Sequence, residues 1–348
     1  MKIALYAFSI FMIVATLMPV VKKDYWTFRV FDYPRFQKLI LISALIVIWL
    51  TEGYQTLSQV DFGIVFALFL LWAWLIKQII PYSPFYPKMV ISAKKQEEES
   101  IELLVANVYQ YNDQYDKARQ LLEKEQSDIF VLVETDQRWK EEIEVFKSEY
   151  PYQVELPIDN TYGMLLYSKL ELQNVEINYL INEEVPSIAA DITVQGQTVR
   201  LHAIHPTPPV PGENTHSTER DAEILMVGKR VKEENIPSII MGDLNDVAWS
   251  YTTELFLKIS GMGDPRRGRG MYNTFHAKYP FMRWPLDHFF VSSHFRVKKI
   301  KVHNSIGSDH FPISIALVIN PATHNEKLEA SAEEKEEAEE KIVQGINF

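Results

Sequence analysis

Three apolar runs within the first 80 residues constrain the fold of this chain more than any other feature. The run at residues 3–21 contains no charged side chain. Because a helix rises about 1.5 Å per residue, this run is long enough to cross a hydrocarbon core of about 30 Å. A shorter run follows at residues 39–50, and a third covers residues 62–76 and extends toward Ile80. We therefore expect residues 1–80 to form three transmembrane helices.

Two other interpretations of these runs are weaker. The first run could be a cleaved signal peptide, but it lacks a small-x-small cleavage site and two more apolar runs follow it. The second run alone could be a buried helix of a soluble domain. Aromatic residues near the ends of the runs favour membrane helices, because amphipathic rings prefer the headgroup layer. These residues are Trp49, Trp72, Trp74 and Tyr82.

The positive charges that flank the runs predict an orientation. One side of the expected membrane holds Lys22, Lys23, Arg29, Arg35, Lys38, Lys77, Lys88, Lys94 and Lys95. The other side holds only Lys2. Since Lys and Arg are retained on the cytoplasmic side, we expect a multi-pass protein of the bacterial inner membrane with its large domain in the cytoplasm.

The remainder of the chain divides into three segments. Residues 81–100 contain three prolines and end in KKQEEES, which predicts an exposed, irregular linker. Residues 101–320 form the expected domain. Residues 321–348 include AEEKEEAEEK and predict an acidic tail that is either disordered or a solvated helix.

Composition excludes several classes of protein. The formal net charge of -11 weighs against a protein that coats nucleic acid, because the molecule as a whole repels polyanions. The chain has no cysteine, which excludes disulfides, thiolate nucleophiles and cysteine-based metal sites.

From residue 101 the pattern changes to short β-type runs. A helix is expected around residues 115–122, with others at 217–234 and within 250–260. Strands outnumber these helices, and few connections resemble regular βαβ units. A mixed sheet, or two packed sheets flanked by helices, therefore fits better than a doubly wound parallel sheet. Two of the expected strands end at Asn107 and at Glu134. The others cover residues 163–168, 188–194, 198–204, 238–242, 286–292 and 312–319.

Polar side chains gather where these strands begin and end. They are Asn107, Glu134, His205, Asp243, Asn245, Asp287, Asp309 and His310. Together they supply carboxylates and amides for a hard cation such as Mg²⁺, and histidines for proton transfer. Cleavage of a phosphoester needs such a set, because a metal must neutralise the phosphoryl charge, a base must activate water, and a further group must assist the leaving oxygen.

These residues and their neighbours resemble the endonuclease/exonuclease/phosphatase superfamily, which includes deoxyribonuclease I, exonuclease III, neutral sphingomyelinases and inositol polyphosphate 5-phosphatases. The matching motifs stand in the family's order and cover nearly all of residues 101–318. They are VANV, FVLVET, YGMLLYSK, HAIHPTPP, IMGDLND, PLDHFFVS and GSDHFPI. The resemblance implies a four-layer α/β/β/α sandwich and a hydrolase that uses Mg²⁺, with Mn²⁺ as a substitute.

The resemblance also implies a role for each residue at the metal. Glu134 corresponds to the principal metal-ligand carboxylate, and Asn107 stands beside it. Asp309 corresponds to a further carboxylate of the metal site.

Five residues correspond to the catalytic groups. Asp243 resembles the aspartate that orients or activates the attacking water, and Asn245 would hold a phosphate oxygen. His310 resembles the histidine beside the scissile phosphate, and Asp287 resembles its carboxylate partner. His205 aligns with a histidine of the deoxyribonuclease I, sphingomyelinase and 5-phosphatase branches, whereas exonuclease III-like enzymes carry tyrosine there.

Each assignment has a structural alternative. The amides and carboxylates could close turns after strands, remain solvated or form structural ion pairs. His310 could be a plain turn residue. His202 shares a strand with His205, and we interpret His202 as a strand histidine because His205 adjoins Pro206 at the strand's exit.

The loop at residues 261–283 is expected to border the site, since it lies between the Asp243 and Asp287 elements. Its basic residues could grip a phosphate-bearing substrate, or the loop could simply be solvated. These residues are Arg266, Arg267, Arg269, Lys278 and Arg283. Trp284 and Phe281 could instead lean on lipid headgroups.

Two classes of function follow. The first is a membrane-anchored phosphoester hydrolase, which would contact the bilayer through residues 3–80. Its substrate could be a lipid headgroup or a small phosphate ester, or it could be a nucleic acid, in which case the protein would be a DNA or RNA endonuclease. The second is a non-catalytic binding module that retains the fold, or a membrane protein whose soluble part is only a scaffold. The sequence does not identify a protein partner.

Overall fold

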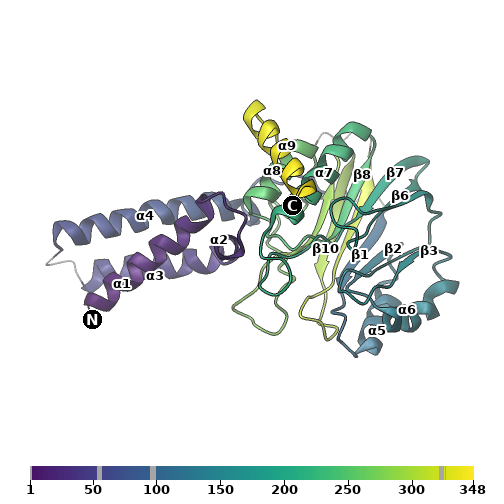
Figure 1. The fold of residues 1–348 in the computed structure, drawn as a ribbon, viewed down its shortest axis with the longest axis horizontal. Helices are drawn as coiled ribbons and strands as arrows, with labels where there is room; N and C mark the ends of the chain where they lie inside the picture. Colours follow the sequence, from purple (N-terminus) through teal and green to yellow (C-terminus); the bar gives the residue numbers. More distant parts are fainter. Residues whose placement is uncertain (1, 53–56, 95–98, 321–324, 326) are drawn as a thin grey trace.

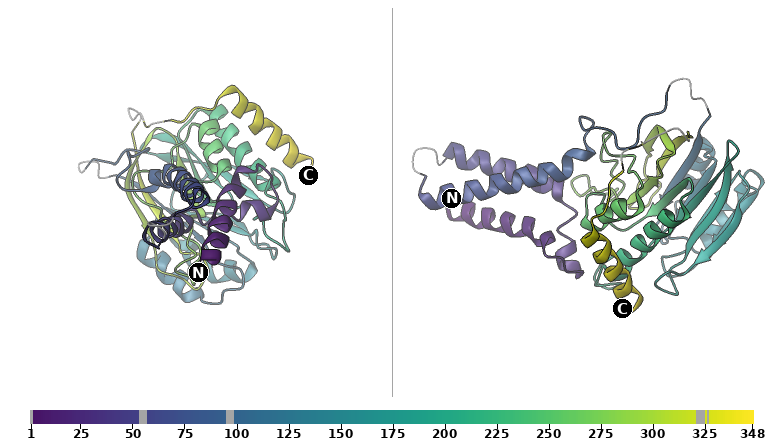
Figure 2. Two further views of the ribbon diagram at one scale, coloured as in Figure 1. Left: turned by 90° about the vertical axis from the view of Figure 1, so that its left-hand side faces the viewer. Right: turned by 90° about the horizontal axis from the view of Figure 1, so that it is seen from above.

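The computed structural model of the chain describes residues 2–52, 57–94, 99–320, 325 and 327–348. Residues 53–56, parts of the expected linker (95–98) and parts of the expected tail (321–324 and 326) lie outside these residues. Figures 1 and 2 show a bundle of helices that projects from one end of a larger α/β domain, with the N-terminus at the far end of the bundle.

The bundle consists of α1, α3 and α4, and the short helix α2 lies between α1 and α3. Their bounds are Lys2–Leu17, Arg35–Glu52, Gln59–Ile79 and, for α2, Trp26–Arg29. Buried apolar side chains such as Ile42, Trp49 and Leu68 pack inside the bundle, while large apolar side chains such as Phe66 stay exposed on its outside. An apolar outer surface is typical of helices that face lipid.

Two segments, Lys2–Val20 and Gln59–Tyr82, are long and apolar enough to cross a membrane. Helix α3 is not among these candidates, because Arg35 and Lys38 shorten its apolar stretch. The three expected helices are therefore present in the bundle, but only two of them qualify as candidate spans by length and composition.

The larger domain contains two mixed β-sheets. The order of strands is β10-β11-β1-β2-β4-β3 in the first sheet and β5-β6-β7-β8-β9 in the second. Each sheet contains one parallel pair, β1–β2 and β7–β8, among antiparallel neighbours. The bounds in the first sheet are β1 Ile101–Asn107, β2 Ile129–Val133, β3 Tyr152–Leu156, β4 Met164–Ser168, β10 Phe295–Val302 and β11 Ile313–Ile319. Those in the second are β5 Gln173–Asn178, β6 Ser187–Val194, β7 Gln197–Ala203, β8 Ser238–Asp243 and β9 Asp287–Val291.

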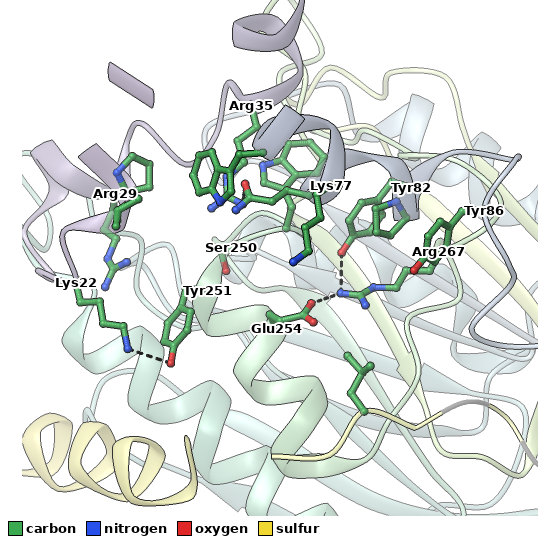
Figure 3. Close-up of a pocket in the computed structure, with 17 residues that line it drawn as sticks. Lys22, Arg29, Arg35, Lys77, Tyr82, Tyr86, Ser250, Tyr251, Glu254 and Arg267 are labelled. Atoms are coloured by element: carbon green, nitrogen blue, oxygen red, sulfur yellow. Dashed lines mark hydrogen bonds and ion pairs between the residues drawn. The ribbon is translucent and has the colours of Figure 1, made fainter. Parts of the chain in front are cut away.

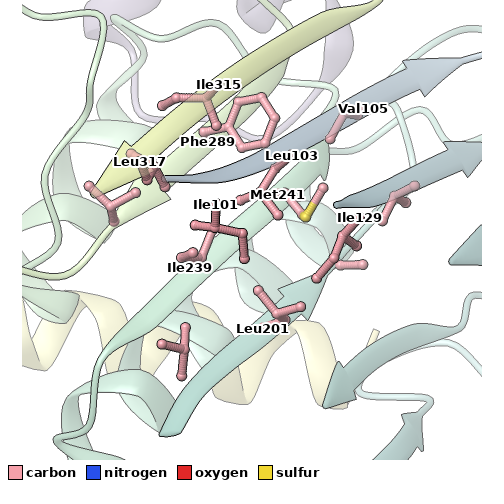
Figure 4. Packing of buried hydrophobic residues seen from close by; sticks show 14 of the residues in the cluster. Ile101, Leu103, Val105, Ile129, Leu201, Ile239, Met241, Phe289, Ile315 and Leu317 are labelled. Atoms are coloured by element: carbon pink, nitrogen blue, oxygen red, sulfur yellow. The ribbon is translucent and has the colours of Figure 1, made fainter. Parts of the chain in front are cut away.

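The main core lies between the two sheets (Figure 4). Because side chains alternate along a strand, Leu103 and Val105 of β1 point into this core, where Ile239 and Met241 of β8 also lie. The intervening Leu104 of β1 belongs to a second core, beneath the helices on the outer face of the first sheet. This double-sided burial makes the central strands apolar almost throughout, which is why the sequence pattern located them.

Helices cover both outer faces and complete an α/β/β/α order, as the resemblance implied. The first sheet is covered by α5 and α6, and the second by α7, α8 and α9. Their bounds are Tyr115–Glu125, Gln137–Ile143, Thr218–Glu234, Tyr251–Ser260 and Ala332–Ile346.

The structure differs from expectation at the two ends of the domain. The expected linker is not exposed throughout, since Tyr82, Met89 and Val90 are buried in the domain. The acidic segment forms a helix, α9, as one of the two expected alternatives, but this helix is not solvated all round, because it buries Ala338 and Ile342 among the side chains of α7 and α8. In both segments a few apolar residues among many polar ones provide the contact surface, and such sparse residues give little signal in the sequence.

The approach of β8 to the chain after β7 requires glycine at position 242. Gly242 has a φ of +149°, and a Cβ there would lie 1.9 Å from the carbonyl oxygen of Ile204. We expect Gly242→Ala to lower the free energy of unfolding by more than about 3 kcal/mol, since backbone atoms must move. Gly196→Ala is the matched control, because its φ is +76° but no atom lies within 4 Å, so only roughly 1–2 kcal/mol should be lost. Denaturant unfolding of both variants measures the difference, and equal losses would contradict this account.

Candidate active site

The polar side chains predicted from the sequence converge at one edge of the paired sheets. Strand β1 ends at this edge with Asn107, and its parallel neighbour β2 ends just before Glu134. Strand β8 of the second sheet ends there with Asp243. Strand β9 begins there, because Asp287 pairs with Asp243 in the antiparallel register. The edge therefore collects residues from segments that are far apart in the sequence.

Asp243 is the centre of the cluster and is fully buried. Its Oδ2 accepts a hydrogen bond from Nδ2 of Asn107 at 3.0 Å and lies 3.5 Å from Nε2 of His310. The same oxygen lies 4.0 Å from Nε2 of His205. The other oxygen, Oδ1, accepts the backbone N–H of Asn245 at 2.9 Å. A buried carboxylate with these partners stays ionised, and it can accept a proton or orient a donor.

His310 lies between two buried carboxylates. Its Nδ1 is 2.8 Å from Oδ2 of Asp287, and its Nε2 faces Asp243. Burial alone would lower the pKa of His310, but the charges of Asp287 and Asp243 outweigh burial and raise this pKa to about 10. His310 is therefore an imidazolium at neutral pH, which suits a group that stabilises negative charge on a phosphoryl group.

Asp287 is fixed by β9 and by a neighbouring hydroxyl. The Oγ1 of Thr274 accepts the backbone N–H groups of Leu286 and Asp287, both at 3.2 Å. The carboxylate keeps its second oxygen, Oδ1, without a hydrogen-bond partner in the described part of the chain.

Glu134 lies on the opposite side of Asn107 from Asp243. The Nδ2 of Asn107 donates to Oε1 of Glu134 at 2.6 Å, so this amide joins the two carboxylates. Burial raises the pKa of Glu134 to about 7. Its backbone is left-handed, with a φ of 60°, a conformation that L residues adopt at an energetic cost.

His205 and Asn245 complete the cluster. His205 is buried, and this burial lowers its pKa to about 4, so the imidazole is neutral at pH 7. Its Nδ1 has no partner among the described residues, and Tyr162 lies against its ring at 5.6 Å. Asn245, with a φ of 52°, donates its side-chain amide to the carbonyl of Pro206 at 3.0 Å. His202 lies beside Glu234 instead of Asp243, at 3.5 Å, as a strand histidine.

The carboxylate of Asp309 forms no hydrogen bond with the other predicted site residues in the described part of the chain. The residue is half-buried, and its carboxylate oxygen is 3.4 Å from the hydroxyl of Ser308. The negative charge of Asp309 contributes to the raised pKa of Glu134, which places it near that carboxylate.

The donor set fits a hard cation. Asp243, Asp287 and His310 offer ligand atoms that lie within 4.8 Å of one another. However, His310 already pairs with both carboxylates as a cation, and a metal would compete with its charge. Glu134 fits a metal better, because its carboxylate is partly buried with a raised pKa and has only amide donors as partners. A divalent ion would offset that loss of solvation.

The loop at residues 261–283 borders the site, but its arginines do not do so as expected. Arg266 is buried and pairs with Asp264 at 2.9 Å and with Nδ1 of His288 at 2.6 Å. Arg267 pairs with Glu254 on α8. These two guanidiniums are therefore held by carboxylates of the domain and are neither freely solvated nor directed at the Asp243 cluster by an ion pair. The loop reaches the site through Phe275, whose ring lies 4.9 Å from that of His310.

Two further residues that the sequence analysis missed hold the catalytic loop. The carbonyl of Asn245 accepts hydrogen bonds from the hydroxyl of Tyr33, at 2.9 Å, and from Arg220, at 2.8 Å. Tyr33 lies between α2 and α3, 212 positions from Asn245. No local pattern could have revealed a contact of that separation.

Comparisons with known proteins agree with the resemblance. Residues 104–310 match the model of the Endonuclease/Exonuclease/phosphatase family. D. rerio TDP2 complexed with single strand DNA product is 18% identical with a TM-score of 0.54, over 64% of this chain and 100% of that chain. The endonuclease/exonuclease/phosphatase from Bacteroides vulgatus is 18% identical with a TM-score of 0.51, over 64% and 100%. The one from Beutenbergia cavernae is 16% identical with a TM-score of 0.51, over 64% and 72%. A search of curated proteins found no match.

The charge of His310 should make stability depend on pH. Its folded pKa of about 10 lies above the ordinary value of 6.5, so its contribution is complete below pH 6.5 and is lost as the pH rises toward 10. Asp287→Asn should therefore flatten the fall in unfolding free energy between pH 6.5 and pH 10. Asp264→Asn is the control, because it removes a buried carboxylate that pairs with Arg266 and not with His310. Denaturant unfolding at several pH values gives both profiles, and a parallel fall in Asp287→Asn and the unaltered chain would contradict the assignment.

Proposed function

From the premise that the chain belongs to the endonuclease/exonuclease/phosphatase family and is a phosphoester hydrolase, we propose that it uses Mg²⁺ and acts at the surface of a membrane. The observation that carries the hydrolytic part is the buried cluster in which Asp243 contacts Asn107, His310 and the backbone of Asn245. Such a cluster combines an ionised base, an imidazolium and a cation-binding carboxylate around one point.

The proposed mechanism assigns one task to each side chain. Asp243 orients a water molecule for in-line attack on phosphorus. His310, kept protonated by Asp287, stabilises the charge that develops on the phosphoryl oxygens. His205 is neutral and assists the leaving oxygen as a hydrogen-bond donor. Asn245 holds a phosphate oxygen once its amide leaves Pro206.

Glu134 and Asn107 would hold the metal, with Asp309 nearby. A bound Mg²⁺ supplies positive charge to the phosphoryl group and Lewis acidity to the reaction. Mn²⁺, which prefers similar oxygen ligands, is the expected substitute.

The position of the site beside the bundle supports action at a membrane. Tyr33 reaches Asn245, and the ring of Trp284 packs edge-on against Tyr33 at 5.6 Å. Trp284 also stacks on Phe275, which contacts His310. A short series of aromatic contacts thus connects the catalytic histidine to the segment between α2 and α3.

An exposed apolar loop lies at the same place. Phe281 is 88% exposed, and Tyr279 and Met282 are also exposed. The carbonyl of Phe281 accepts a hydrogen bond from Gln37, in the first turn of α3, at 3.0 Å. Aromatic and apolar side chains at the base of membrane helices suit the headgroup layer.

The substrate that these features favour is a phosphoester at the bilayer surface, either a lipid headgroup or a small ester. The net charge of -11 disfavours a long polyanion. Nucleic acid is the second candidate, because the structure of D. rerio TDP2, which shares the fold, holds a single strand DNA product. A substrate panel of phospholipid vesicles, soluble phosphoesters and plasmid DNA, with Mg²⁺, Mn²⁺ and Ca²⁺, separates them. Metal-dependent nicking of plasmid without hydrolysis of lipid would overturn the preference.

We place residues 1–80 in a bacterial inner membrane and the domain of residues 101–320 in the cytoplasm. The domain-side ends of the helices carry a cluster of cations that includes Lys22, Arg29 and Arg35. Such cations stay on the cytoplasmic side. The linker of residues 81–100 and the segment of residues 321–348 complete the proposed organisation.

Replacement of the central histidine tests the chemistry. We expect His310→Ala to lower turnover about a hundred- to ten-thousandfold, because an imidazolium beside the phosphoryl group is lost. The loss of this cation also leaves Asp287 and Asp243 without their charged partner and should destabilise the fold, so turnover is compared where circular dichroism shows the variant to be folded. His294→Ala, which alters a histidine bonded to Ser292 outside the site, should leave turnover unchanged. Glu134→Gln should lose activity that excess Mg²⁺ partly restores. Normal turnover of His310→Ala on the panel's best substrate would refute the mechanism.

Replacement of the exposed loop residues tests the membrane preference. We expect Tyr279→Ser combined with Phe281→Ser to reduce hydrolysis of vesicle substrate several-fold, because less apolar surface enters the headgroup layer. Hydrolysis of a soluble phosphoester should not change. Val145→Ser is the control, since Val145 is 62% exposed on the η3 turn beside α6. Equal losses on both substrates would indicate damage to the site in place of lost membrane contact.

A further inference from the structure

A cavity of about 530 Å³ lies where the bundle meets the domain (Figure 3). Its walls come from the domain-side ends of the bundle helices, including Val20, Arg35 and Trp74, and from the domain, including Trp249 and Arg267. The volume falls within the range of roughly 300–1,000 Å³ that is typical of small-ligand sites. None of the residues assigned above to catalysis or to the metal lines this cavity.

The ionisable side chains that line this junction cavity are mostly basic. Five cations line it, and Glu254 is the one carboxylate among its lining residues. The cations are Lys22, Arg29, Arg35, Lys77 and Arg267. Carboxylates pair with Lys22 and with the three arginines, so the charge that an anion in this space would neutralise first is that of Lys77.

The three arginines are held in place but not fully satisfied. Arg29 pairs with Asp24 at 3.0 Å, Arg35 pairs with Asp32, and Arg267 pairs with Glu254. All three are buried, and the Nε atom of each has no hydrogen-bond partner in the described part of the chain. Unsatisfied guanidinium donors are uncommon in protein interiors, where a buried donor without an acceptor is costly.

Lys77 provides the accessible charge. It lies in the last turn of α4, and Figure 3 shows its side chain pointing into the cavity between Glu254 and the bundle. Among the described residues, no carboxylate forms an ion pair with Lys77. Lys22, on the far wall, bonds to Glu337 at 2.7 Å and to the hydroxyl of Tyr251 at 3.3 Å.

The cavity lies at the depth where lipid headgroups would be. The two candidate spans end at Val20 and Tyr82, and both of these residues line it. The guanidinium carbon of Arg35 lies over the ring of Trp74, 5.7 Å from the ring centroid. Interfacial aromatics beside Lys and Arg are the usual surroundings of headgroup phosphates.

We propose that the junction cavity binds the phosphate group of an anionic lipid, with Lys77 as its direct contact, at a site separate from the active site. The proposal rests on the membrane assignment in the proposed function but not on the hydrolytic reaction. A bound phosphate would join α4 to α8 and to the loop of Arg267, and so would fix the domain against the bundle.

Native mass spectrometry of the full chain in detergent tests the proposal, with phosphatidylglycerol and phosphatidylcholine of equal chain length as probes. We expect one phosphatidylglycerol to be retained in preference to phosphatidylcholine. Lys77→Met should weaken this retention about tenfold, since one charge-assisted contact is lost. Lys77→Arg should retain it. Lys23→Met is the matched control, because Lys23 is exposed at a similar depth and does not line the cavity.

Inorganic phosphate tests whether the cavity binds the phosphate group of a lipid or free phosphate. If millimolar phosphate raises the melting temperature of the unaltered chain but not of Lys77→Met, and displaces the lipid, the site takes the free anion as well. If phosphate has no effect while the lipid binds, the lipid is the ligand. Equal loss of lipid from Lys77→Met and Lys23→Met, or no preference for phosphatidylglycerol together with no effect of phosphate, would overturn the proposal. Hydrolysis of a soluble phosphoester by Lys77→Met should stay normal, which separates this outcome from failure of the catalytic assignment.

Discussion

The carboxylate of Asp243 is the group on which the rest of the site depends. It is buried at the end of β8, and its two oxygens contact an amide, two imidazoles and the backbone of the next loop. A buried negative charge is tolerated only with such partners. The position of β8 depends in turn on Gly242, which allows the strand to approach the carbonyl of Ile204. Two consecutive residues therefore determine the packing of β8, through Gly242, and the charge at the centre of the site, through Asp243.

The same cluster separates groups of similar chemistry into different charge states. His310 has two carboxylate neighbours and gains a proton, whereas His205 is buried farther from Asp243 and stays neutral. Among the carboxylates, Asp243 is paired with the imidazolium of His310 and with amide donors, while Glu134 has only amide donors and a raised pKa. Identical side chains thus acquire different tasks from their surroundings, as acid–base catalysis requires.

Part of this arrangement follows from the sequence, because polar residues directly after parallel strands such as β1 and β2 lie at the same edge of a sheet. The apolar central strands were predictable because they are buried on both faces. Strand β5 was not, since it is an edge strand whose residues are mostly exposed and alternate weakly. The pairing of Arg266 with Asp264 was equally hidden, because a basic residue in a loop reads as solvated until its partner is known. The contact of Tyr33 with Asn245 depends on how the bundle docks, and no periodicity encodes that docking.

Hydrogen bonds from Tyr33 to the carbonyl of Asn245, and from the indole of Trp249 to the carbonyl of Asp32 at 2.9 Å, tie the loop after β8 to the segment between α2 and α3. Arg220 on α7 bonds to the same carbonyl of Asn245. For an enzyme held in a bilayer, such ties set both the height and the tilt of the active site. If the substrate is a lipid, as proposed, it would be encountered by lateral diffusion in two dimensions, at a fixed distance from the bundle. Turnover would follow the surface density of the substrate in the membrane and not its concentration in the bulk solution.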